Sequence, residues 1–391
     1  MRTQVGIVGA GPAGLMLAHL LSLKGIDSVV LETRDRTYVE HRVRAGVLEQ
    51  GSVDLLDAAG AGARMREEGL VHRGIQLRFR GADHRIDFSA LTGGRCITVY
   101  GQQELVKDLI ALRLTAAHPI LFEVSSVGLH NLDSEQPSIT FLMDGASMTL
   151  ECDVVAGCDG FHGVSRETIP DGVLTAYERE YPFAWLGILA TIAPSSEELV
   201  YCYHERGFAL LSMRSPTVSR LYLQVDADER IGDWSDARIW EELHTRVASE
   251  GWSLQEGPIT EKGISAMRSY VVEPMQFGRL YLCGDAAHIV PPTGAKGMNL
   301  ALRDVSLLAE ALAAFCGTGD TAALGAYSSH CLRRVWRAQH FSWWMTSMLH
   351  RFPESDPYQV QLQLAQLDYT VNSLAASTSL AENYVGYEWT S

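Results

Sequence analysis

Glycines and an acid with a regular spacing stand near the start of the chain. Gly9, Gly11 and Gly14 form the pattern G-x-G-x-x-G, and Glu32 follows them. The apolar residues on either side of the glycines predict a strand, then a helix beginning near Pro12, then a second strand that ends at Glu32. This order is typical of a dinucleotide-binding βαβ unit.

Each part of such a unit has a physical role. Gly9 permits a tight turn, Gly11 lets the backbone approach a pyrophosphate, and Gly14 lets the helix lie close on the strand. The helix start directs free N–H groups and the positive end of its dipole at the phosphates. Glu32 is placed to accept a hydrogen bond from an adenosine ribose hydroxyl. We therefore expect a bound dinucleotide.

Two further acids follow strand-like segments. Asp159 lies in C-D-G, where we expect a turn, with His162 and Arg166 close by. Asp285 lies in G-D-A-A-H, before a loop of prolines and glycines and a helix that begins around Gly297. An acid at the end of a strand suits a sugar-like hydroxyl, and a helix start suits an electron-rich group.

The remaining patterns predict the elements that position these residues. Residues 45–62 and 102–113 predict helices, and residues 139–156 predict two strands. Residues 177–270 contain several strand-like pieces without crossover helices, and one amphipathic helix near 236–247. Successive strands of this kind favour a mostly antiparallel sheet in a separate domain, where we expect a substrate.

Composition limits the possible partners. The 391 residues carry a net charge of −15, which disfavours nucleic acid and anionic membrane surfaces. The seven cysteines show neither C-x-x-C nor metal-type spacing, so we expect reduced thiols, no metal and a cytoplasmic location. A strand that starts close to Met1 leaves no room for a signal peptide, and no apolar run approaches membrane length.

Two segments allow more than one interpretation. The charged residues 33–44 form either a solvated helix and loop or a phosphate contact through Arg42 and Arg44. The aromatic run F-S-W-W-M-T-S-M-L-H-R-F indicates core packing or a subunit interface.

Taken together, the G-x-G-x-x-G, C-D-G and G-D-A-A-H motifs resemble the fingerprints of single-component FAD-dependent aromatic hydroxylases. Blocks such as R-A-G-V-L-E-Q-G, P-P-T-G-A-K-G, F-S-W-W-M-T-S and A-E-N-Y-V-G extend this resemblance along the whole chain. They match best the members of the family that hydroxylate 4-hydroxybenzoate at the 3-position. Such enzymes use FAD, NADPH or NADH, and O2, and form a flavin C4a-hydroperoxide.

The resemblance implies a discontinuous α/β fold with an α+β substrate domain. A Rossmann-like FAD-binding domain would comprise residues 1–73, 98–178 and 268–340. An inserted, mostly antiparallel β-sheet domain of residues 74–97 and 179–267 would bind a small aromatic acid. Residues 341–391 would form a helical C-terminal region and the interface of a homodimer.

The resemblance also implies roles for individual residues. Arg214 would hold the substrate carboxylate, Pro292 would face its hydroxyl, and Arg220 would take part in flavin movement. Tyr201 and Tyr384 would pass the hydroxyl proton toward His72 and solvent. The full substrate set is Tyr201, Ser212, Met213, Arg214, Tyr222 and Pro292.

For FAD, the family positions fall on residues in every part of the predicted cofactor domain. They are Gly9, Gly11, Gly14, Glu32, Arg42, Arg44, Gln102, Asp159, Asp285, Lys296, Met298 and Asn299. No second glycine fingerprint exists, so NAD(P)H would use a groove with Arg44, His162, Arg166 and Arg268 as candidates.

The sequence departs from the family at two of these places. Thr33 replaces an arginine that follows the ribose acid, which leaves the choice between NADH and NADPH open, and Met298 replaces a more usual leucine.

Hydroxylation of a related acid such as 3-hydroxybenzoate is an alternative function, although Tyr201 and Tyr384 speak against it. A flavin-binding sensor would not need the full set of tyrosines and arginines, and a disulfide reductase would need paired cysteines.

Overall fold

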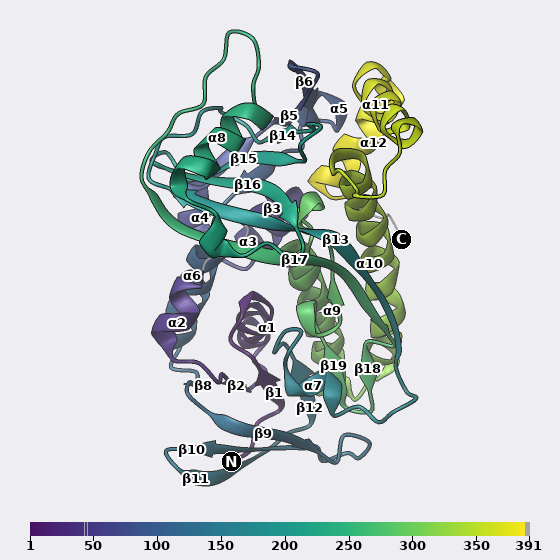
Figure 1. Ribbon diagram of the computed structural model, residues 1–391. Helices are drawn as coiled ribbons and strands as arrows, with labels where there is room; N and C mark the ends of the chain where they lie inside the picture. Colours follow the sequence, from purple (N-terminus) through teal and green to yellow (C-terminus); the bar gives the residue numbers. More distant parts are fainter. Residues whose placement is uncertain (43, 45, 388–391) are drawn as a thin grey trace.

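A computed structural model describes residues 1–42, 44 and 46–387 (Figure 1). The last four residues of the predicted C-terminal region, 388–391, and Ala45 of the R-A-G-V-L-E-Q-G block lie outside the described residues. The chain is built around a parallel sheet and a larger, mostly antiparallel sheet. The expected combination of an α/β nucleotide-binding fold with an inserted β-sheet and a helical end is confirmed.

The glycine motif lies at the carboxyl end of a central strand in the parallel sheet. The order of this sheet is β18-β19-β12-β1-β2-β8, and β18 alone pairs in the antiparallel sense. All residues of β1, β2, β12 and β19 are buried, as expected for parallel strands with both faces covered. The strands are β1 (Val5–Val8), β2 (Ser28–Leu31), β8 (Ile120–Leu121), β12 (Val154–Gly157), β18 (Gln276–Phe277) and β19 (Leu280–Leu282).

Helix α1 (Pro12–Leu23) packs against α9 (Gly297–Thr318) and α6 (Gln102–Thr115). The starts predicted near Pro12, at residue 102 and around Gly297 are confirmed. The charged segment contains the short helix α2 (Arg36–His41), none of whose residues is buried, so the solvated interpretation holds for this part.

Two small antiparallel sheets flank these elements, and they correct two predictions. Residues 47–49 form strand β3 rather than the start of a helix, because they pair with β7 through Val47 and Val99. The segment 139–156 holds parts of three strands instead of two, since Cys152 and Asp153 separate β11 from β12. The strands are β3 (Val47–Glu49), β4 (Leu70–His72), β7 (Ile97–Val99), β9 (Ser125–His130), β10 (Ser138–Met143) and β11 (Ala146–Glu151).

The large sheet has the order β20-β17-β13-β16-β15-β14-β5-β6. Its strands pair in the antiparallel sense except β14 with β5. The strands are β5 (Gly74–Phe79), β6 (Ala82–Asp87), β13 (Thr175–Ala190), β14 (Val200–Cys202), β15 (Ala209–Ser215), β16 (Val218–Asp226), β17 (Ile259–Glu273) and β20 (His288–Ile289).

The two faces of the large sheet have different covers. Helix α8 (Asp236–Arg246) packs its apolar residues on one face. The other face packs against residues of α10 (Ala322–Leu349), α11 (Pro357–Asn372) and α12 (Leu374–Val385). In Figure 1, α10 runs from the level of β18 and β19 up to α11 and α12, so it passes beside both the parallel sheet and the large sheet.

The remaining helices are short. They are α3 (Gln50–Ala58), α4 (Ala63–Glu68), α5 (Phe88–Leu91), α7 (Val164–Glu167) and the 3-10 turns η1 (Ile231–Asp233), η2 (Gly284–Ala286) and η3 (Pro292–Gly294). The predicted domain boundaries at 178/179 and 267/268 fall inside β13 and β17, so this division stays a prediction. Within residues 1–42, 44 and 46–387, none of the helices has the length and apolar character that a membrane span requires.

Candidate active site

The glycine turn leaves open space in front of the start of α1. A Cβ on Gly9, whose φ is +104°, would lie 2.4 Å from the carbonyl oxygen of Cys158, and a Cβ on Gly14 would lie 2.0 Å from that of Gly9. A Cβ on Gly11 would meet nothing within 4 Å. No side chain caps the helix at Gly11. The turn therefore has free space beside uncapped N–H groups, which suits a pyrophosphate.

Glu32 is fixed across this turn. Its carboxylate oxygens accept hydrogen bonds from the backbone N–H groups of Ala10 at 2.8 Å and Arg34 at 2.9 Å. Each carboxylate oxygen has further acceptor capacity for a ribose hydroxyl. The acid is thus held at the end of β2, next to the glycine motif.

Asp285, Arg42 and Arg44 form a charged rim beyond the carboxyl end of β19. Asp285 is exposed, yet desolvation by the surrounding protein raises the pKa of its carboxyl group. Desolvation and the charge of Arg42 lower the pKa of Arg44, and the charge of Asp285 opposes this shift. The rim therefore brings two cations and one acid together beside the turn that follows β19.

Asp304 holds the turn that carries Asp285, and our sequence analysis missed it. Its Oδ2 atom accepts hydrogen bonds from the Gly284 N–H at 3.0 Å and from His288 Nε2 at 2.7 Å. One carboxylate oxygen thus binds both ends of the turn. Asp304 lies in an apolar helical run with no distinguishing spacing, so the sequence carried no signal for it.

Three predicted cofactor residues lie at the start of α9. Asn299 donates hydrogen bonds to the Val47 and Ala295 carbonyl oxygens, both at 2.9 Å, and accepts one from the Glu49 N–H at 2.9 Å. Met298 is half-buried against the core of the parallel sheet, and Lys296 precedes the helix. Gln102 begins α6 and is half-buried.

Lys296 is bound by protein groups rather than open toward a ligand. Its Nζ atom donates hydrogen bonds to Glu49 Oε1 at 2.6 Å, to the Tyr384 carbonyl oxygen at 2.9 Å and to the Asn383 carbonyl oxygen. An ammonium has three donors, so these bonds use all of them. Burial alone would raise the pKa of Glu49, but Lys296 and Arg334 hold it below its usual value. Much of the Lys296 charge is therefore matched locally.

The predicted substrate tyrosines lie on one face of the large sheet. Tyr201 pairs with Leu210 on β15, and Leu210 pairs with Tyr222 on β16, so all three side chains share a face. The Tyr201 and Tyr384 hydroxyls form a hydrogen bond, and both residues are buried. Burial raises the pKa of both phenols. The structure thus brings together two phenols that are 183 positions apart.

Arg214 lies toward the end of β15 on this side of the sheet. Its Nη2 atom donates to the Tyr222 hydroxyl at 3.4 Å and its Nη1 atom to the Met213 carbonyl oxygen at 3.1 Å. Its Nε atom is buried without a hydrogen-bond partner among the described residues. Burial lowers the pKa of Arg214. A desolvated guanidinium with spare donors is a site for a carboxylate.

Arg220 is a second desolvated cation beside Tyr222. Burial would raise the pKa of Tyr222, but the charges of Arg214 and Arg220 lower it overall. The Arg220 Nε and Nη1 atoms are buried without a hydrogen-bond partner among the described residues, and Nη1 lies 3.9 Å from Glu261. Buried Ser212 pairs with Arg220 across the strands, so it points to the same face.

The structure also describes the surroundings of His72 and Pro292, the two other residues predicted for the hydroxyl end. His72 is buried on β4, and neither ring nitrogen has a hydrogen-bond partner among the described residues, so it does not contact the tyrosine pair through a hydrogen bond. Burial lowers the pKa of His72 to about 4. The Pro292 carbonyl oxygen accepts a hydrogen bond from the Ala295 N–H at 2.9 Å.

Three of the four NAD(P)H candidates meet around the ring of Phe161. The His162 ring lies 5.0 Å from it edge-on, and the guanidinium carbons of Arg166 and Arg268 lie 4.5 and 4.8 Å from its centroid. Arg166 also donates to the Ala286 carbonyl oxygen at 3.1 Å, next to the acidic turn. Arg44, the fourth candidate, belongs to the charged rim.

Asp159 supports the loop that carries Phe161. Its Oδ2 atom accepts hydrogen bonds from the N–H and the hydroxyl of Ser165, both at 2.9 Å. Burial raises its pKa, and its Oδ1 atom is buried without a partner among the described residues.

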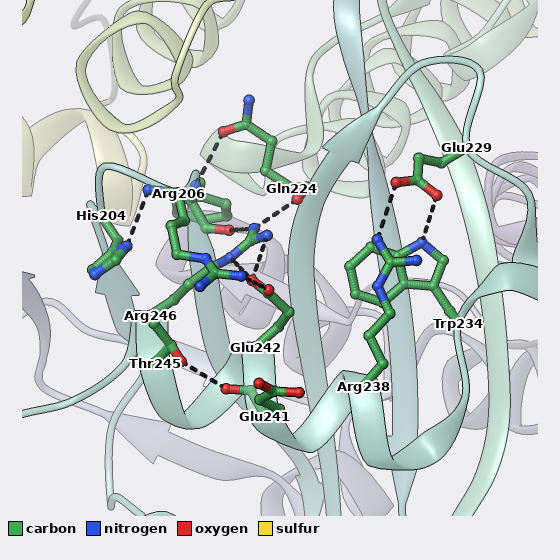
Figure 2. Close-up of polar contacts among 11 residues, drawn as sticks. His204, Arg206, Gln224, Glu229, Trp234, Arg238, Glu241, Glu242, Thr245 and Arg246 are labelled. Carbon is green, nitrogen blue, oxygen red and sulfur yellow. Dashed lines mark hydrogen bonds and ion pairs between the residues drawn. The ribbon is translucent and has the colours of Figure 1, made fainter.

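A cavity of about 300 Å³ lies elsewhere, beside α8. Figure 2 shows that its polar side chains face one another: Glu242 pairs with Arg206 and Arg246, and Glu229 pairs with Arg238 and Trp234. Because these charges are already matched and no predicted site residue lines the cavity, we do not place the active site there. The described residues contain no cluster of three or more side chains suited to a metal ion.

The glycine turn, the two acids after parallel strands and the desolvated arginines fit a dinucleotide cofactor beside a small anionic ligand. This arrangement is typical of a dinucleotide-dependent oxidoreductase. Residues 2–342 match the family model described as an FAD binding domain. The chain belongs to the FAD-dependent aromatic hydroxylases, and the enzyme class and FAD predicted from the sequence are confirmed. NAD(P)H and O2 are the usual cosubstrates of this family.

The chain is also similar to named relatives and, in its fold, to a solved structure. The chain is 48% identical over 99% of its length to p-hydroxybenzoate hydroxylase from Acinetobacter baylyi, of which it covers 96%. It is 28% identical over 77% of its length to 6-methylpretetramide 4-monooxygenase from Streptomyces rimosus, of which it covers 73%. Its fold is similar to that of p-nitrophenol 4-monooxygenase from Pseudomonas putida, with a TM-score of 0.84 at 20% identity over 99% of this chain and all of that one.

Proposed function

We propose that the enzyme hydroxylates 4-hydroxybenzoate at the 3-position and releases 3,4-dihydroxybenzoate (protocatechuate). The observation that carries this proposal is the placement of two groups on one face of the large sheet. Arg214 and Tyr222 offer donors for a carboxylate, and the bonded hydroxyls of Tyr201 and Tyr384 offer a partner for a phenol. An aromatic ring with an acid and a hydroxyl in para positions would offer one substituent to each group. The similarity to p-hydroxybenzoate hydroxylase supports the same assignment.

The protein would hold FAD at the carboxyl ends of the parallel strands, through the residues that follow β1 and β2 on one side and β19 on the other. The glycine turn and Glu32 would bind the adenosine side, while Asp285 and the start of α9 would bind the ribityl and flavin side. Bound FAD supplies electron storage from NAD(P)H and the activation of O2. The side chains of this chain would bind and orient the aromatic ring of the substrate and would accept the proton of its hydroxyl.

Ionising the substrate phenol is the step that the protein must assist. A phenol with a pKa near 10 is about three units from ionisation at pH 7, which corresponds to roughly 4 kcal/mol. Tyr201 would donate its hydrogen bond to the phenolate oxygen, and Tyr384 would donate to Tyr201. Since His72 makes no hydrogen bond to either tyrosine, we propose that the proton leaves toward it through water.

The carboxylate end requires burial of an anion in a protein of net charge −15. Arg214 has an unpartnered Nε atom, and its bonds to Tyr222 and to the Met213 carbonyl oxygen use only two of its five N–H donors, so three remain for the ligand. Each charge-assisted bond contributes about 1.5–3 kcal/mol. The second desolvated cation, Arg220, adds to the positive potential.

We further propose that NAD(P)H binds at the Phe161 cluster (Phe161, His162, Arg166 and Arg268). We also propose that the enzyme is a homodimer and that it is located in the cytoplasm. On α11, the side chains of Tyr358, Leu362 and Tyr369 are exposed, and they suit a contact with a second copy. The seven free cysteines suit a reducing compartment.

The test uses the purified FAD-loaded enzyme. We expect 4-hydroxybenzoate to accelerate NADH or NADPH oxidation and 3,4-dihydroxybenzoate to accumulate in near-equal amount to the coenzyme consumed. Release of peroxide without hydroxylated product, or an equal or larger response to 3-hydroxybenzoate, would contradict the proposal.

A further inference from the structure

A buried polar stripe lies at the end of α10. Ser342 and Thr346 lie one turn apart on the helix, and His350 directly follows its last residue, with its N–H bonded to the Thr346 carbonyl oxygen at 3.0 Å. Each of them has an exposed fraction of 0%. Polar side chains in such a position need partners in the protein. The partners of Thr346 and His350 lie at opposite ends of the proposed site.

His350 is linked to the carboxylate end through Trp185. Its Nε2 atom accepts a hydrogen bond from Trp185 Nε1 at 2.7 Å, and its Nδ1 atom donates to the Thr346 carbonyl oxygen at 3.1 Å. Trp185 lies 4.9 Å from the ring of Tyr222, whose hydroxyl accepts from Arg214. Burial lowers the pKa of His350 to about 3, so the ring is neutral and Nε2 remains an acceptor.

Aromatic packing fixes the His350 ring in this orientation. It stacks on Phe208 at 4.3 Å and on Phe183 at 4.9 Å. Gln363 donates to the His350 carbonyl oxygen at 2.7 Å, which ties the end of α10 to α11. The acceptor for Trp185 therefore cannot turn without disturbing the packed core.

Thr346 contacts the hydroxyl end. Its hydroxyl donates to the Ser342 carbonyl oxygen at 2.7 Å, so it accepts the hydrogen bond that links it to the Thr293 hydroxyl at 2.9 Å. Thr293 directly follows Pro292. One turn away, Ser342 lies so close to Gly294 that a Cβ there would be 2.5 Å from the Ser342 hydroxyl. Thr346 thus binds the loop that we propose faces the phenol, and His350, four residues further along, binds Trp185.

We propose that Thr346 and His350 are positioning residues that set the separation between the two ends of the substrate site. Thr346 on α10 binds the loop after Pro292, and His350, directly after the helix, binds Trp185. Together they keep the two ends of the site at one spacing, which selects a ring whose acid and hydroxyl are para over a meta isomer. This inference rests on the proposed function, and it assigns to α10 the discrimination between isomers. Loss of either bond would let one end of the site move and would weaken the preference for the para isomer.

The experiment measures dissociation constants of 4-hydroxybenzoate and 3-hydroxybenzoate with the FAD-loaded enzyme, from the change in the flavin spectrum. In Thr346→Val and in His350→Leu we expect the preference for the para isomer to fall by about tenfold. A factor of this size corresponds to the free energy of one neutral hydrogen bond. His350→Gln keeps an acceptor and should retain most of the preference. Thr370→Val makes the same replacement at a buried threonine of α11 and should leave the ratio unchanged.

A double-mutant cycle separates positioning from general damage. Trp185→Phe removes the indole N–H, so adding His350→Leu should then change the isomer ratio by less than twofold. Fully additive effects, or equal weakening of both isomers in Thr346→Val, would overturn the inference while leaving the proposed function intact. A wild-type enzyme that does not prefer 4-hydroxybenzoate would overturn both.

Discussion

The Nζ atom of Lys296 donates a hydrogen bond to the carbonyl oxygen of Tyr384 at 2.9 Å, and both residues are buried. Lys296 precedes α9 in the loop after Pro292, and Tyr384 lies on α12 near the end of the chain. The bond therefore joins the loop of the proposed cofactor site to the helix that presents a phenol to Tyr201. Glu49 completes the link from β3.

Replacing Lys296 by methionine should destabilise the enzyme and misplace Tyr384. The change leaves buried Glu49 with Arg334 as its cation, and losing one partner of a buried pair costs about 3 kcal/mol. We expect this loss in urea denaturation, together with a lower yield of hydroxylated product per NAD(P)H. Lys107→Met breaks a half-buried pair with Glu104 on the surface of α6 and should cost less than about 1 kcal/mol. Equal losses in the two variants would contradict this role.

Replacing Tyr201 by phenylalanine should leave FAD binding intact while most NAD(P)H oxidation yields peroxide instead of product. The reason is that the phenol loses its hydrogen-bond donor but the ring packing remains. Product and peroxide are measured together in one reaction. Tyr203→Phe is a matched control, because the buried Tyr203 hydroxyl has no hydrogen-bond partner among the described residues. Unchanged product yield in Tyr201→Phe would remove the tyrosine from the mechanism.

Replacing Gly11 by alanine should weaken FAD binding by tenfold or more without unfolding the protein. The new Cβ meets no protein atom within 4 Å, so it occupies only the space proposed for the pyrophosphate. Fluorescence titration of the apoprotein gives the affinity, and thermal unfolding of the same sample gives the stability. Gly317→Ala, near the end of α9 and equally unobstructed, should bind FAD normally and gain up to about 1 kcal/mol of stability. Normal FAD binding by Gly11→Ala would be inconsistent with the proposed cradle.

His72 should make the enzyme less stable in acid. Its folded-state pKa of about 4 lies below the ordinary value of 6.5, so the unfolded chain binds a proton more readily. Stability from this residue is present above pH 6.5 and is lost as the pH falls from 6.5 through 4. The full shift corresponds to roughly 3 kcal/mol. In urea denaturation with excess FAD at pH 7 and 4.5, His72→Asn should lose less stability than the wild type, whereas the exposed-site variant His41→Asn should lose as much.

The sequence predicted the parts of the site that are local in the chain. The glycine turn, Glu32, the acid after β19 and the start of α9 each follow from a short motif, since backbone geometry and helix dipoles act within a few residues. Strand β3 was assigned to a helix, because its pairing with β7 depends on residues about 50 positions away.

The parts that depend on distant contacts could not be read from patterns. The Tyr201–Tyr384 pair came only from resemblance to a family, and its spacing carries no periodic signal. Asp304 and Thr346 are polar residues inside apolar helical runs, and His350 directly follows one, so the sequence alone gives no reason to separate them from satisfied core residues. Their partners appear only after the sheets and helices are packed.

The most direct test is a crystal structure of the FAD-loaded enzyme with 4-hydroxybenzoate bound. We expect the carboxylate within about 3 Å of two Arg214 nitrogens and the phenol oxygen at hydrogen-bonding distance from the Tyr201 hydroxyl. A ligand bound in the reverse direction, with its acid at Tyr201, or one bound in the Phe161 cluster instead, would contradict the account.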